Sequence, residues 1–337
     1  MTSALVLLAD IGGTNARFAL ADTGSRMPLL VDSVRQFEVA DFPSLAETAQ
    51  HYLGALAVTP GSMSSGVFAI AGRIDGDEAR ITNHPWVISR SGTRRALGLQ
   101  HLLVVNDFAA QAMAVELLTG KDLVAIAGVP WTPPSGNRRT YAVIGPGTGL
   151  GVSALIVRDG QRVVLETEGG HVSFAAETAE EAAILERLAS YYGHVSNERL
   201  VSGGGMVNIH RALSEIAGET TSLLRPEQIT AGASRGDPRC QRAVEIFCAV
   251  FGAIAGDLVL TLGAWDGVFL TGGLVPKLLA DLQRSSFRQR FEAKGRFAQA
   301  MARVPSVAVM HPHAGLLGAA AFALQSLSDQ QPAASFG

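Results

Sequence analysis

The feature that most constrains the fold is a strand–glycine turn–strand pattern that occurs twice in the sequence. The first copy has apolar strands at residues 5–9 and 16–20 around a turn at 10–15, and the second has strands at 140–144 and 152–157 around a turn at 145–151. Neither copy fits the strand–turn–helix of a GxGxxG dinucleotide site. Because the copies share little residue identity, the repeat is architectural. It predicts two related α/β domains, as the length of 337 residues also suggests.

Composition indicates a protein with a large buried core. The chain is 47% hydrophobic and 17% charged, which is typical of a folded α/β protein rather than a disordered one. The net charge is −3 and no basic cluster is present, so we expect no nucleic-acid partner. The only two cysteines, Cys240 and Cys248, lie in one helical stretch without a CxxC motif. They are predicted to be buried thiols, and a structural zinc site is not expected.

No segment has the pattern of a leader or a membrane span. The apolar run at 4–9 follows no basic region and ends on Asp10, so it is too short for a signal sequence. The most apolar long window, 244–265, contains Glu245, Asp257 and several glycines and is predicted to be a buried helix. We therefore expect a cytoplasmic protein without a membrane partner.

Hydrophobic periodicity and turn residues divide the rest of the chain into alternating elements. Further strands are expected at 35–39, 66–72, 103–105, 268–270 and 307–310, and helices at 44–57 (capped by Ser44), 91–97, 109–117, 179–192, 207–216, 239–262, from 276, and at 316–327. Loops are expected at 82–86 and 128–136. The last helix is expected to return to the first domain. The predicted domains are therefore residues 1–118 plus 312–328, a small α/β domain, and residues 119–311, a larger one.

A carboxylate is predicted where a strand meets a helix. The apolar strand at 103–105 is followed by Asn106 and Asp107, and a helical stretch then begins. In open α/β sheets, ligands bind at this carboxyl edge of the strands. A catalytic role for Asp107 is one interpretation. The alternative is that Asp107 only caps the helix, since aspartate and asparagine are favoured caps.

Four glycine turns are candidate phosphate sites, because backbone N–H groups in such turns bind anions. The turns Gly12–Thr14 and Gly147–Gly149 join strands, whereas Ser202–Gly205 and Thr271–Gly273 are expected to precede helices, where the helix dipole adds to anion binding. No GxxxxGK[ST] motif is present, which excludes a P-loop. Asp10 stands beside the first turn and is a natural ligand for Mg²⁺; the alternative is an aspartate that caps the turn.

Two further polar clusters have the residue types that recognise sugar hydroxyls. Glu168 and His171 are separated by two glycines, which suggests a sharp loop that presents both groups in one direction. The other cluster contains Glu198. Glu168, His171 and Glu198 could, together with Asn106, hydrogen-bond neighbouring hydroxyls of a sugar. A structural histidine is the alternative for His171. A metal site would need more histidine or cysteine at ligand spacing.

Taken together, the motifs resemble those of one family. Asp10–Arg17, Asn106–Phe108, Gly145–Gly151, Glu168–His171, Gly193–Arg199 and Gly272–Gly273 are similar to the motifs of bacterial ATP-dependent glucokinases, over residues from about Leu5 to Leu324. The resemblance implies the actin-like ATPase fold, with two ribonuclease-H-like domains around a cleft that glucose closes. It implies a protein that is commonly a homodimer. The zinc-binding cysteines of the related repressor and kinase group are absent, which places the chain in the zinc-free branch.

The resemblance also assigns roles. Asp107 would be the catalytic base, and Asn106, Asp107, Glu168, His171 and Glu198 would bind glucose. ATP phosphates would be held by Ala9, Asp10, Ile11, Gly12, Gly13 and Thr14, and the nucleotide site would be completed by Gly147, Thr148, Gly149, Gly272 and Gly273. Asp10 would hold Mg²⁺ directly or through water. The chain departs from the family pattern at Pro146, where a small residue is expected, and at Gly204, where proline is common.

The expected reaction is ATP + D-glucose → ADP + glucose 6-phosphate. One alternative is a kinase for another hexose, such as mannose, fructose or an N-acetylated sugar. Another is a sugar-sensing regulator without turnover, and a third is an actin-like ATPase that does not act on sugars. No helix-turn-helix precedes Leu5 and all the reacting groups are present, so we expect an enzyme.

Overall fold

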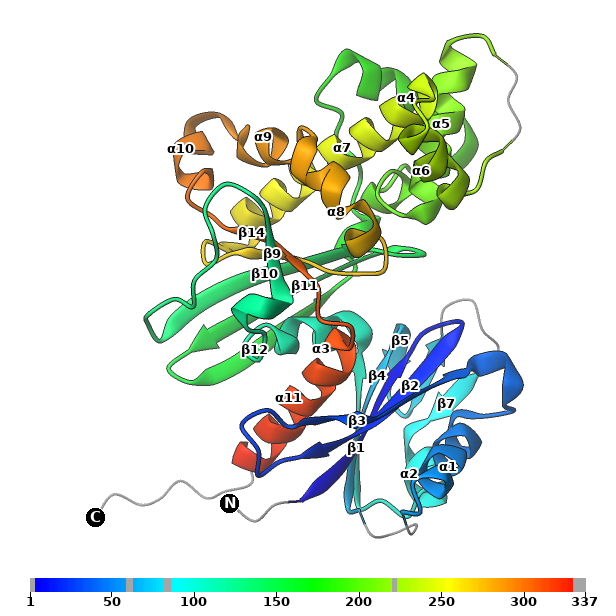
Figure 1. The fold of residues 1–337 in the computed structure, drawn as a ribbon, viewed down its shortest axis with the longest axis vertical. Coiled ribbons are helices and arrows are strands. Elements are labelled where there is room, and N and C mark those ends of the chain that lie inside the picture. Colours follow the sequence, from blue (N-terminus) through cyan, green and yellow to red (C-terminus); the bar gives the residue numbers. More distant parts are fainter. Residues whose placement is uncertain (1–3, 59–62, 82–85, 220–222, 330–337) are drawn as a thin grey trace. The chain divides into compact units, whose positions relative to one another are not determined.

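The chain forms two units, each with its own sheet (Figure 1). The computed structural model describes residues 4–58, 63–81, 86–219 and 223–329. Unit 1 contains the chain up to Leu118 and again from His311, and unit 2 is Thr119–Met310. The loop expected at 82–86 lies outside the described residues except for Trp86.

Unit 1 is built on a five-stranded sheet of order β3-β2-β1-β4-β8. The first three strands form an antiparallel meander, and β1, β4 and β8 are parallel. The parallel strands therefore end at one edge of the sheet, where β8 leads into helix α3. The strands are β1 (Leu5–Ile11), β2 (Asn15–Asp22), β3 (Leu29–Glu38), β4 (Ser65–Ile70) and β8 (His101–Asn106).

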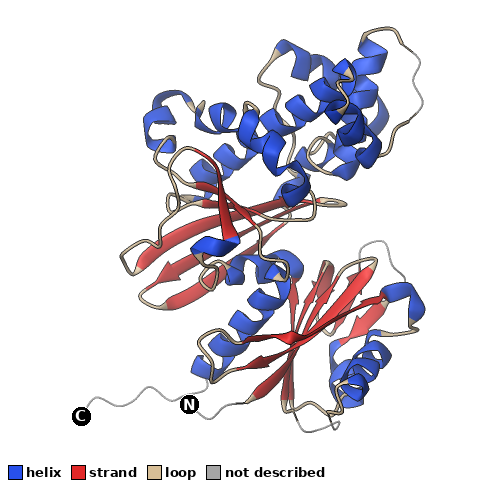
Figure 2. Ribbon diagram, viewed as in Figure 1, coloured by secondary structure: helices blue, strands red, loops and turns tan. Residues whose placement is uncertain are grey.

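Helices cover both faces of this sheet (Figure 2). They are α1 (Leu45–Ala55), α2 (Arg90–Ala96), α3 (Asp107–Ala114) and α11 (Ala314–Asp329), with a 3-10 turn η1 (Val39–Asp41) before α1. Ser44 caps α1 as predicted, because its side chain accepts a hydrogen bond from the N–H of Glu47 at 3.2 Å. On β1, alternate residues Leu7, Ala9 and Ile11 join the core cluster that contains Tyr52 of α1. Helix α11 packs on β1 and alongside α3, so the last helix does return to the first unit.

A small antiparallel sheet in unit 1 was not expected from the sequence. It contains β5 (Gly72–Asp75), β6 (Glu78–Ile81) and β7 (Val87–Ser89), in that order. The hairpin of β5 and β6 turns between Asp75 and Glu78, and at its open end a Cβ atom on Gly72 would overlap the backbone of Arg80. Each strand has three or four residues, which is too short for a hydrophobic period to be recognised.

Unit 2 repeats the strand order of unit 1. Its sheet has the order β12-β11-β10-β13-β14-β9, in which the first five strands correspond to the five of unit 1 and β9 is added at the edge. This confirms the predicted duplication. The strands are β9 (Leu123–Ala127), β10 (Arg138–Pro146), β11 (Leu150–Arg158), β12 (Gln161–Thr167), β13 (Val268–Leu270) and β14 (Ser306–Val309).

The α-helices of unit 2 lie on one side of its sheet (Figure 2). They are α4 (Ala179–Tyr192), α5 (Gly203–Ile216), α6 (Pro226–Ser234), α7 (Pro238–Leu262), α8 (Val275–Arg284), α9 (Phe287–Glu292) and α10 (Ala298–Met301). Four 3-10 turns accompany them: η2 (Gly120–Asp122), η3 (Gly169–His171), η4 (Asn197–Arg199) and η5 (Gly295–Phe297). The expectation that the triple glycine precedes a helix is wrong, because Gly203–Gly205 form the first turn of α5.

Helix α7 is the centre of the core of unit 2. It is long and apolar enough to cross a membrane, but 78% of its most apolar window is buried inside the unit, which agrees with the predicted core helix. Cys240 and Cys248 are buried free thiols, as expected. Burial raises the pKa of Cys248 to about 12, so this thiol is not poised for chemistry.

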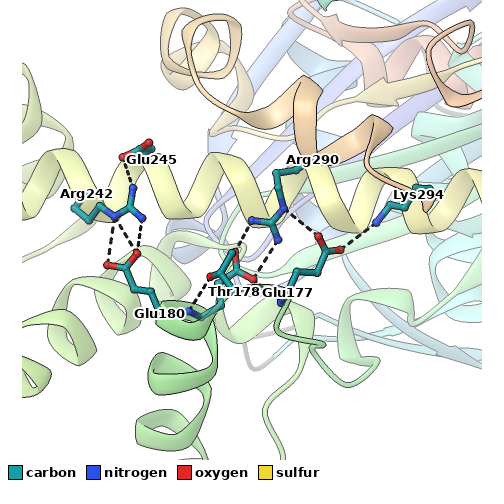
Figure 3. Close-up of polar contacts among 8 residues, drawn as sticks. Glu177, Thr178, Glu180, Arg242, Glu245, Arg290 and Lys294 are labelled. Carbon is teal, nitrogen blue, oxygen red and sulfur yellow. Dashed lines mark hydrogen bonds and ion pairs between the residues drawn. The ribbon is translucent and has the colours of Figure 1, made fainter. Parts of the chain in front are cut away.

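An ion-pair network ties the start of α4 to α7 and α9 (Figure 3). Arg290 binds both carboxylate oxygens of Glu181 at 2.6 and 3.1 Å and also contacts Glu177 at 3.1 Å. Lys294 then joins Glu177 at 3.3 Å to Asp257 of α7 at 2.7 Å. The side chain of Glu181 is only 3% exposed. Burial is the largest single influence on the pKa of Glu181 and would raise it. The hydrogen bonds from Arg290 and from the backbone, together with the charge of Arg290, outweigh burial, and the pKa is lowered.

We predict that Glu181→Gln lowers the free energy of unfolding by about 2 kcal/mol at pH 7, because the amide keeps the shape but leaves the Arg290 charge without its buried partner. A depressed folded-state pKa stabilises the protein above the ordinary value of 4.5 and stops doing so as the pH falls through the folded pKa. The difference between wild type and variant should therefore shrink below pH 4.5. Urea unfolding at several pH values measures it.

Glu245→Gln is the matched control. Glu245 also forms an ion pair with an arginine, Arg242, but its side chain is 52% exposed. Its effect should stay below about 1 kcal/mol at every pH. A loss for Glu181→Gln that is independent of pH would show that packing, rather than the buried ion pair, is responsible.

Candidate active site

Asp107 and Asn106 lie at the junction of β8 and α3 in unit 1. Asn106, not Asp107, is the cap of α3: its side-chain oxygen accepts hydrogen bonds from the N–H groups of Phe108 at 2.8 Å and Ala109 at 3.3 Å. Asp107 is the first residue of the helix, and its Oδ1 lies 3.0 Å from the Phe108 nitrogen. The alternative interpretation, in which Asp107 only caps the helix, is therefore wrong, because the cap is Asn106. The carboxylate of Asp107 is half-buried at the positive end of the helix, where a negative charge is stabilised.

The first glycine turn connects β1 to β2 in the same unit. Gly12 donates its N–H to the carbonyl of Asn15 at 2.9 Å, and Thr14 is exposed at the tip. Ala9 and Ile11 have fully buried side chains and are paired in the sheet with both β2 and β4. The residues of this segment that reach the surface are therefore Asp10, Gly12, Gly13 and Thr14, whereas Ala9 and Ile11 hold the turn in place.

Asp10 projects to the α11 face of the sheet, opposite to its neighbours on β1. A Cβ atom at Gly315 in the first turn of α11 would lie 2.8 Å from the Asp10 Cγ, so only glycine lets the helix start beside this carboxylate. Arg17 contacts Asp10 at 3.6 Å. Burial raises the pKa of Asp10, and the charges of Arg17 and His313 oppose that rise. Asp10 is thus in a strand and does not cap the turn.

The residues around Asp10 were missed as site residues by the sequence analysis. Arg17 was quoted only as part of a motif, and Gly315 and His313 come from the other end of the chain. Burial and the charge of Arg17 lower the pKa of His313. The signal that could have found Arg17 is its position at the end of the first motif, opposite Asp10 in the β1–β2 pairing.

In unit 2, the two other predicted nucleotide turns lie side by side. Gly272 has a φ of +86°, and a Cβ atom there would lie 2.6 Å from the carbonyl oxygen of Pro146. The N–H of Leu274 donates to the same carbonyl at 3.2 Å. Pro146 therefore contacts the Gly272 turn through its carbonyl group, and this contact does not need the N–H group that proline lacks. Gly273 and Thr148 are exposed, and Gly147 and Gly149 are half-buried.

Glu198 is anchored at the Gly147–Gly149 turn. Its Oε2 accepts a hydrogen bond from the N–H of Leu150 at 2.9 Å. A Cβ atom at Gly149 would overlap this same oxygen. The carboxylate of a predicted sugar ligand and the backbone of a predicted phosphate turn are thus in direct contact.

The segment that contains Glu168 and His171 also packs on Leu150. Gly170 packs so closely on the carbonyl of Leu150 that a Cβ atom would overlap it. An isolated bridge between Ser173 and Ser196 joins the segment after His171 to the segment before Glu198. The His171 ring lies 3.9 Å from the Glu168 carboxylate, and both side chains are exposed at 61% and 81%. His171 is therefore not a buried structural histidine.

Leu150 contacts both polar segments of unit 2: its N–H group bonds Glu198, and its carbonyl packs against Gly170, which lies between Glu168 and His171. Unit 1 brings together Asn106 and Asp107 at one strand end, and Asp10 with the Gly12–Thr14 turn at another. Among the residues that the structure describes, no group of three or more histidine, cysteine, aspartate or glutamate side chains could hold a metal ion by itself.

Comparison with known proteins identifies the family. The family model described as Glucokinase matches residues 7–326. A protein from Stenotrophomonas maltophilia (strain R551-3) named Glucokinase is 63% identical over 325 residues, 96% of each chain. The solved structure of a glucokinase from an Antarctic psychrotroph has a TM-score of 0.84 at 35% identity and covers 96% of this chain and 99% of that one.

A more distant structure shares the fold. It is a ROK family glucokinase from Streptomyces griseus in complex with glucose and AMPPNP. Its TM-score is 0.61 at 19% identity, and the match covers 96% of this chain and 100% of that chain. The duplicated five-stranded sheets are thus those of the actin-like ATPase fold of sugar kinases. The match of both family model and close relatives extends over nearly the whole sequence. The chain belongs to the glucokinase family and is an ATP-dependent glucose kinase.

Proposed function

We propose that Asp107 is the general base in the transfer of the ATP γ-phosphoryl group to the 6-hydroxyl of D-glucose. The observation that carries this assignment is the position of the carboxylate in the first turn of α3, directly after the capping Asn106. The capping oxygen of Asn106 leaves its NH₂ group as a donor for a sugar hydroxyl. Asp107 accepts the proton of the 6-hydroxyl as the phosphoryl group is transferred. Phosphoryl transfer needs little covalent help, so orienting this hydroxyl is the main task of the protein.

Glucose is held, in this proposal, by Glu168, His171 and Glu198 of unit 2 together with Asn106 and Asp107 of unit 1. The support is that the Glu198 carboxylate contacts Leu150 and that Gly170, which lies between Glu168 and His171, packs on the same residue. Carboxylate oxygens accept hydrogen bonds from the sugar hydroxyls, and the imidazole of His171 can donate or accept. The exposure of Glu168 and His171 leaves both side chains accessible to a ligand.

The ATP phosphates are assigned to backbone N–H groups of Gly12–Thr14, Gly147–Gly149 and Gly272–Gly273. Ala9 and Ile11 act from within the sheet by fixing the first turn. Mg²⁺ would be held by Asp10, directly or through water. A single carboxylate whose side chain is 19% exposed fits an ion that keeps several waters and takes its other ligands from phosphates. When bound, Mg²⁺ neutralises phosphate charge. We also propose a cytoplasmic homodimer, supported by the resemblance to a family that is commonly dimeric.

Gly149→Ala tests the sugar site. The added methyl group would overlap the Glu198 carboxylate, which is the flexible end of a side chain and moves before the backbone does. We expect the Kd for glucose to rise about tenfold or more, while the melting temperature changes little. Isothermal titration with glucose in the absence of nucleotide measures the effect.

Gly147→Ala is the matched control for glucose binding, because a Cβ atom at Gly147 meets no atom within 4 Å. Its Kd for glucose should equal that of the wild type. If Gly149→Ala also bound glucose normally, the assignment of Glu198 to the sugar would be wrong.

A further inference from the structure

The backbone that carries Glu198 is held by a buried side chain from another helix. Asn208 lies in α5 and is 8% exposed. Its Nδ2 donates a hydrogen bond to the carbonyl oxygen of Arg199 at 2.9 Å. Arg199 follows Glu198 directly in the 3-10 turn η4. Asn208 therefore fixes the peptide group that follows Arg199, one residue beyond the proposed sugar ligand.

Tyr192 at the end of α4 orients Asn208. The Tyr192 hydroxyl donates to Asn208 Oδ1 at 2.9 Å. Since the Arg199 carbonyl can only accept a hydrogen bond, the two contacts together determine which end of the amide faces η4. The guanidinium of Arg199 also stacks over the Tyr192 ring, 3.9 Å from its centroid. Asn208 thus holds the main chain of Arg199, and the Tyr192 ring holds its side chain.

The peptide group on the other side of Arg199 is fixed as well. Ser202 donates its hydroxyl hydrogen to the carbonyl of Glu198 at 2.8 Å, while its Oγ accepts from the N–H of Gly205 at 2.9 Å. Ser202 is the cap of α5, so its loss would disturb the helix itself. Asn208 lies further along α5, and its side-chain bonds go to Arg199 and Tyr192. It is the cleaner point at which to loosen η4 without uncapping the helix.

We propose that Asn208, oriented by Tyr192, is a positioning residue that aims the Glu198 carboxylate and thereby sets the affinity for glucose. The inference rests on the proposed role of Glu198. With η4 held, Glu198 reaches the Leu150 N–H at 2.9 Å. Without the Asn208 contact, the turn gains freedom and the carboxylate spends less time in its binding position. Small displacements of a positioned group have large effects on ligand recognition.

Asn208→Ala is expected to raise the Kd and KM for glucose about tenfold, in the range seen when the partner that orients a ligand-binding side chain is removed. The KM for ATP should remain within about twofold. Because the substitution leaves the Arg199 carbonyl and the Tyr192 hydroxyl without this partner, the melting temperature should also fall. Tyr192→Phe is the milder second variant: it keeps the ring under Arg199 and should raise the glucose Kd about threefold.

Tyr191→Phe is the matched control. The Tyr191 hydroxyl donates to Glu215 at 2.8 Å, and Arg211 lies over the Tyr191 ring, 4.1 Å from its centroid. Tyr191→Phe therefore removes the same kind of hydrogen bond as Tyr192→Phe, but from contacts that do not involve η4. Its glucose Kd should equal that of the wild type. An equal rise for Tyr191→Phe and Tyr192→Phe would overturn the proposal.

A double-mutant cycle with Glu198→Ala decides the mechanism. Glucose Kd is measured by isothermal titration for wild type, Glu198→Ala, Asn208→Ala and the double variant. If Asn208 acts through Glu198, the double variant binds glucose no more weakly than Glu198→Ala alone. Additive losses would overturn the positioning role while leaving Glu198 as a sugar ligand. A lower melting temperature with unchanged glucose Kd in Asn208→Ala would likewise overturn it. Normal glucose binding by Glu198→Ala would instead refute the proposed role of Glu198, and this inference with it.

Discussion

Asp107→Asn is expected to lower kcat by about 10²–10⁴-fold, the range for removal of a general base. The amide has the shape of the carboxylate but cannot take up the proton of the 6-hydroxyl. Asp107 is the first residue of α3, where a negative charge is favourable, so a small loss of stability of about 0.5 kcal/mol is also expected. The Kd for glucose should change by much less than kcat. A coupled assay with Mg-ATP gives kcat, and titration without nucleotide gives the Kd.

Asp237→Asn is the control for this substitution. Asp237 caps α7 by accepting a hydrogen bond from the N–H of Cys240 at 2.8 Å, and asparagine caps helices about as well as aspartate. Its kcat should match the wild type. A kcat for Asp107→Asn close to the wild-type value would rule out the proposed base. Loss of glucose binding in parallel with kcat would assign Asp107 to substrate binding alone.

Gly318→Ala is expected to lower the free energy of unfolding by about 3 kcal/mol, at the upper end of the cost of overpacking. In α11, a Cβ atom at this position would overlap the carbonyl of Ala110 in α3. Alanine is the better helix former by about 1 kcal/mol, so helix propensity alone would predict that Gly318→Ala stabilises the protein. Because the obstacle is the backbone of the helix that begins at Asp107, kcat should fall too. Thermal unfolding and the coupled assay report the two effects.

Gly54→Ala provides the comparison, because Gly54 also lies in a helix but a Cβ atom there meets nothing within 4 Å. This variant should gain about 0.5–1 kcal/mol from propensity alone. If both substitutions stabilised the protein equally, the close contact between α11 and α3 would be contradicted.

Most strands of the two sheets were predictable because their apolar runs are long and bounded by turns. Helix α4 has the predicted bounds, and β13 does as well. Strands β9 and β12 were missed: β9 has only five residues, and the apolar residues of β12 are consecutive and do not alternate with polar ones. Helices α6, α9 and α10 were missed because they are short, with nine, six and four residues.

The start of α5 shows why a local rule can fail. Three consecutive glycines predict a turn, because glycine is a poor helix former. In the structure they begin a helix, since Ser202 caps it and a Cβ atom at Gly205 would lie against the backbone of Leu200. The close approach of η4 is a tertiary constraint, and the sequence of the glycine run does not contain it.

The site was predictable where its groups are neighbours in the sequence, as for Asn106 and Asp107 or for Glu168 and His171. It was not predictable where contacts join distant segments. The hydrogen bond between Glu198 and Leu150 spans 48 positions, and the contact of Asp10 with Gly315 joins the two ends of the described chain. Residue type alone also could not show that Ala9 and Ile11 point into the core.

The return of α11 to β1 affects the order in which the protein can be completed during synthesis. Every residue of unit 2 is translated before α11, so unit 2 can begin to fold while the N-terminal sheet still lacks the helix that covers its Asp10 face. A premature stop codon near the end of the gene would therefore damage the half of the molecule that was made first.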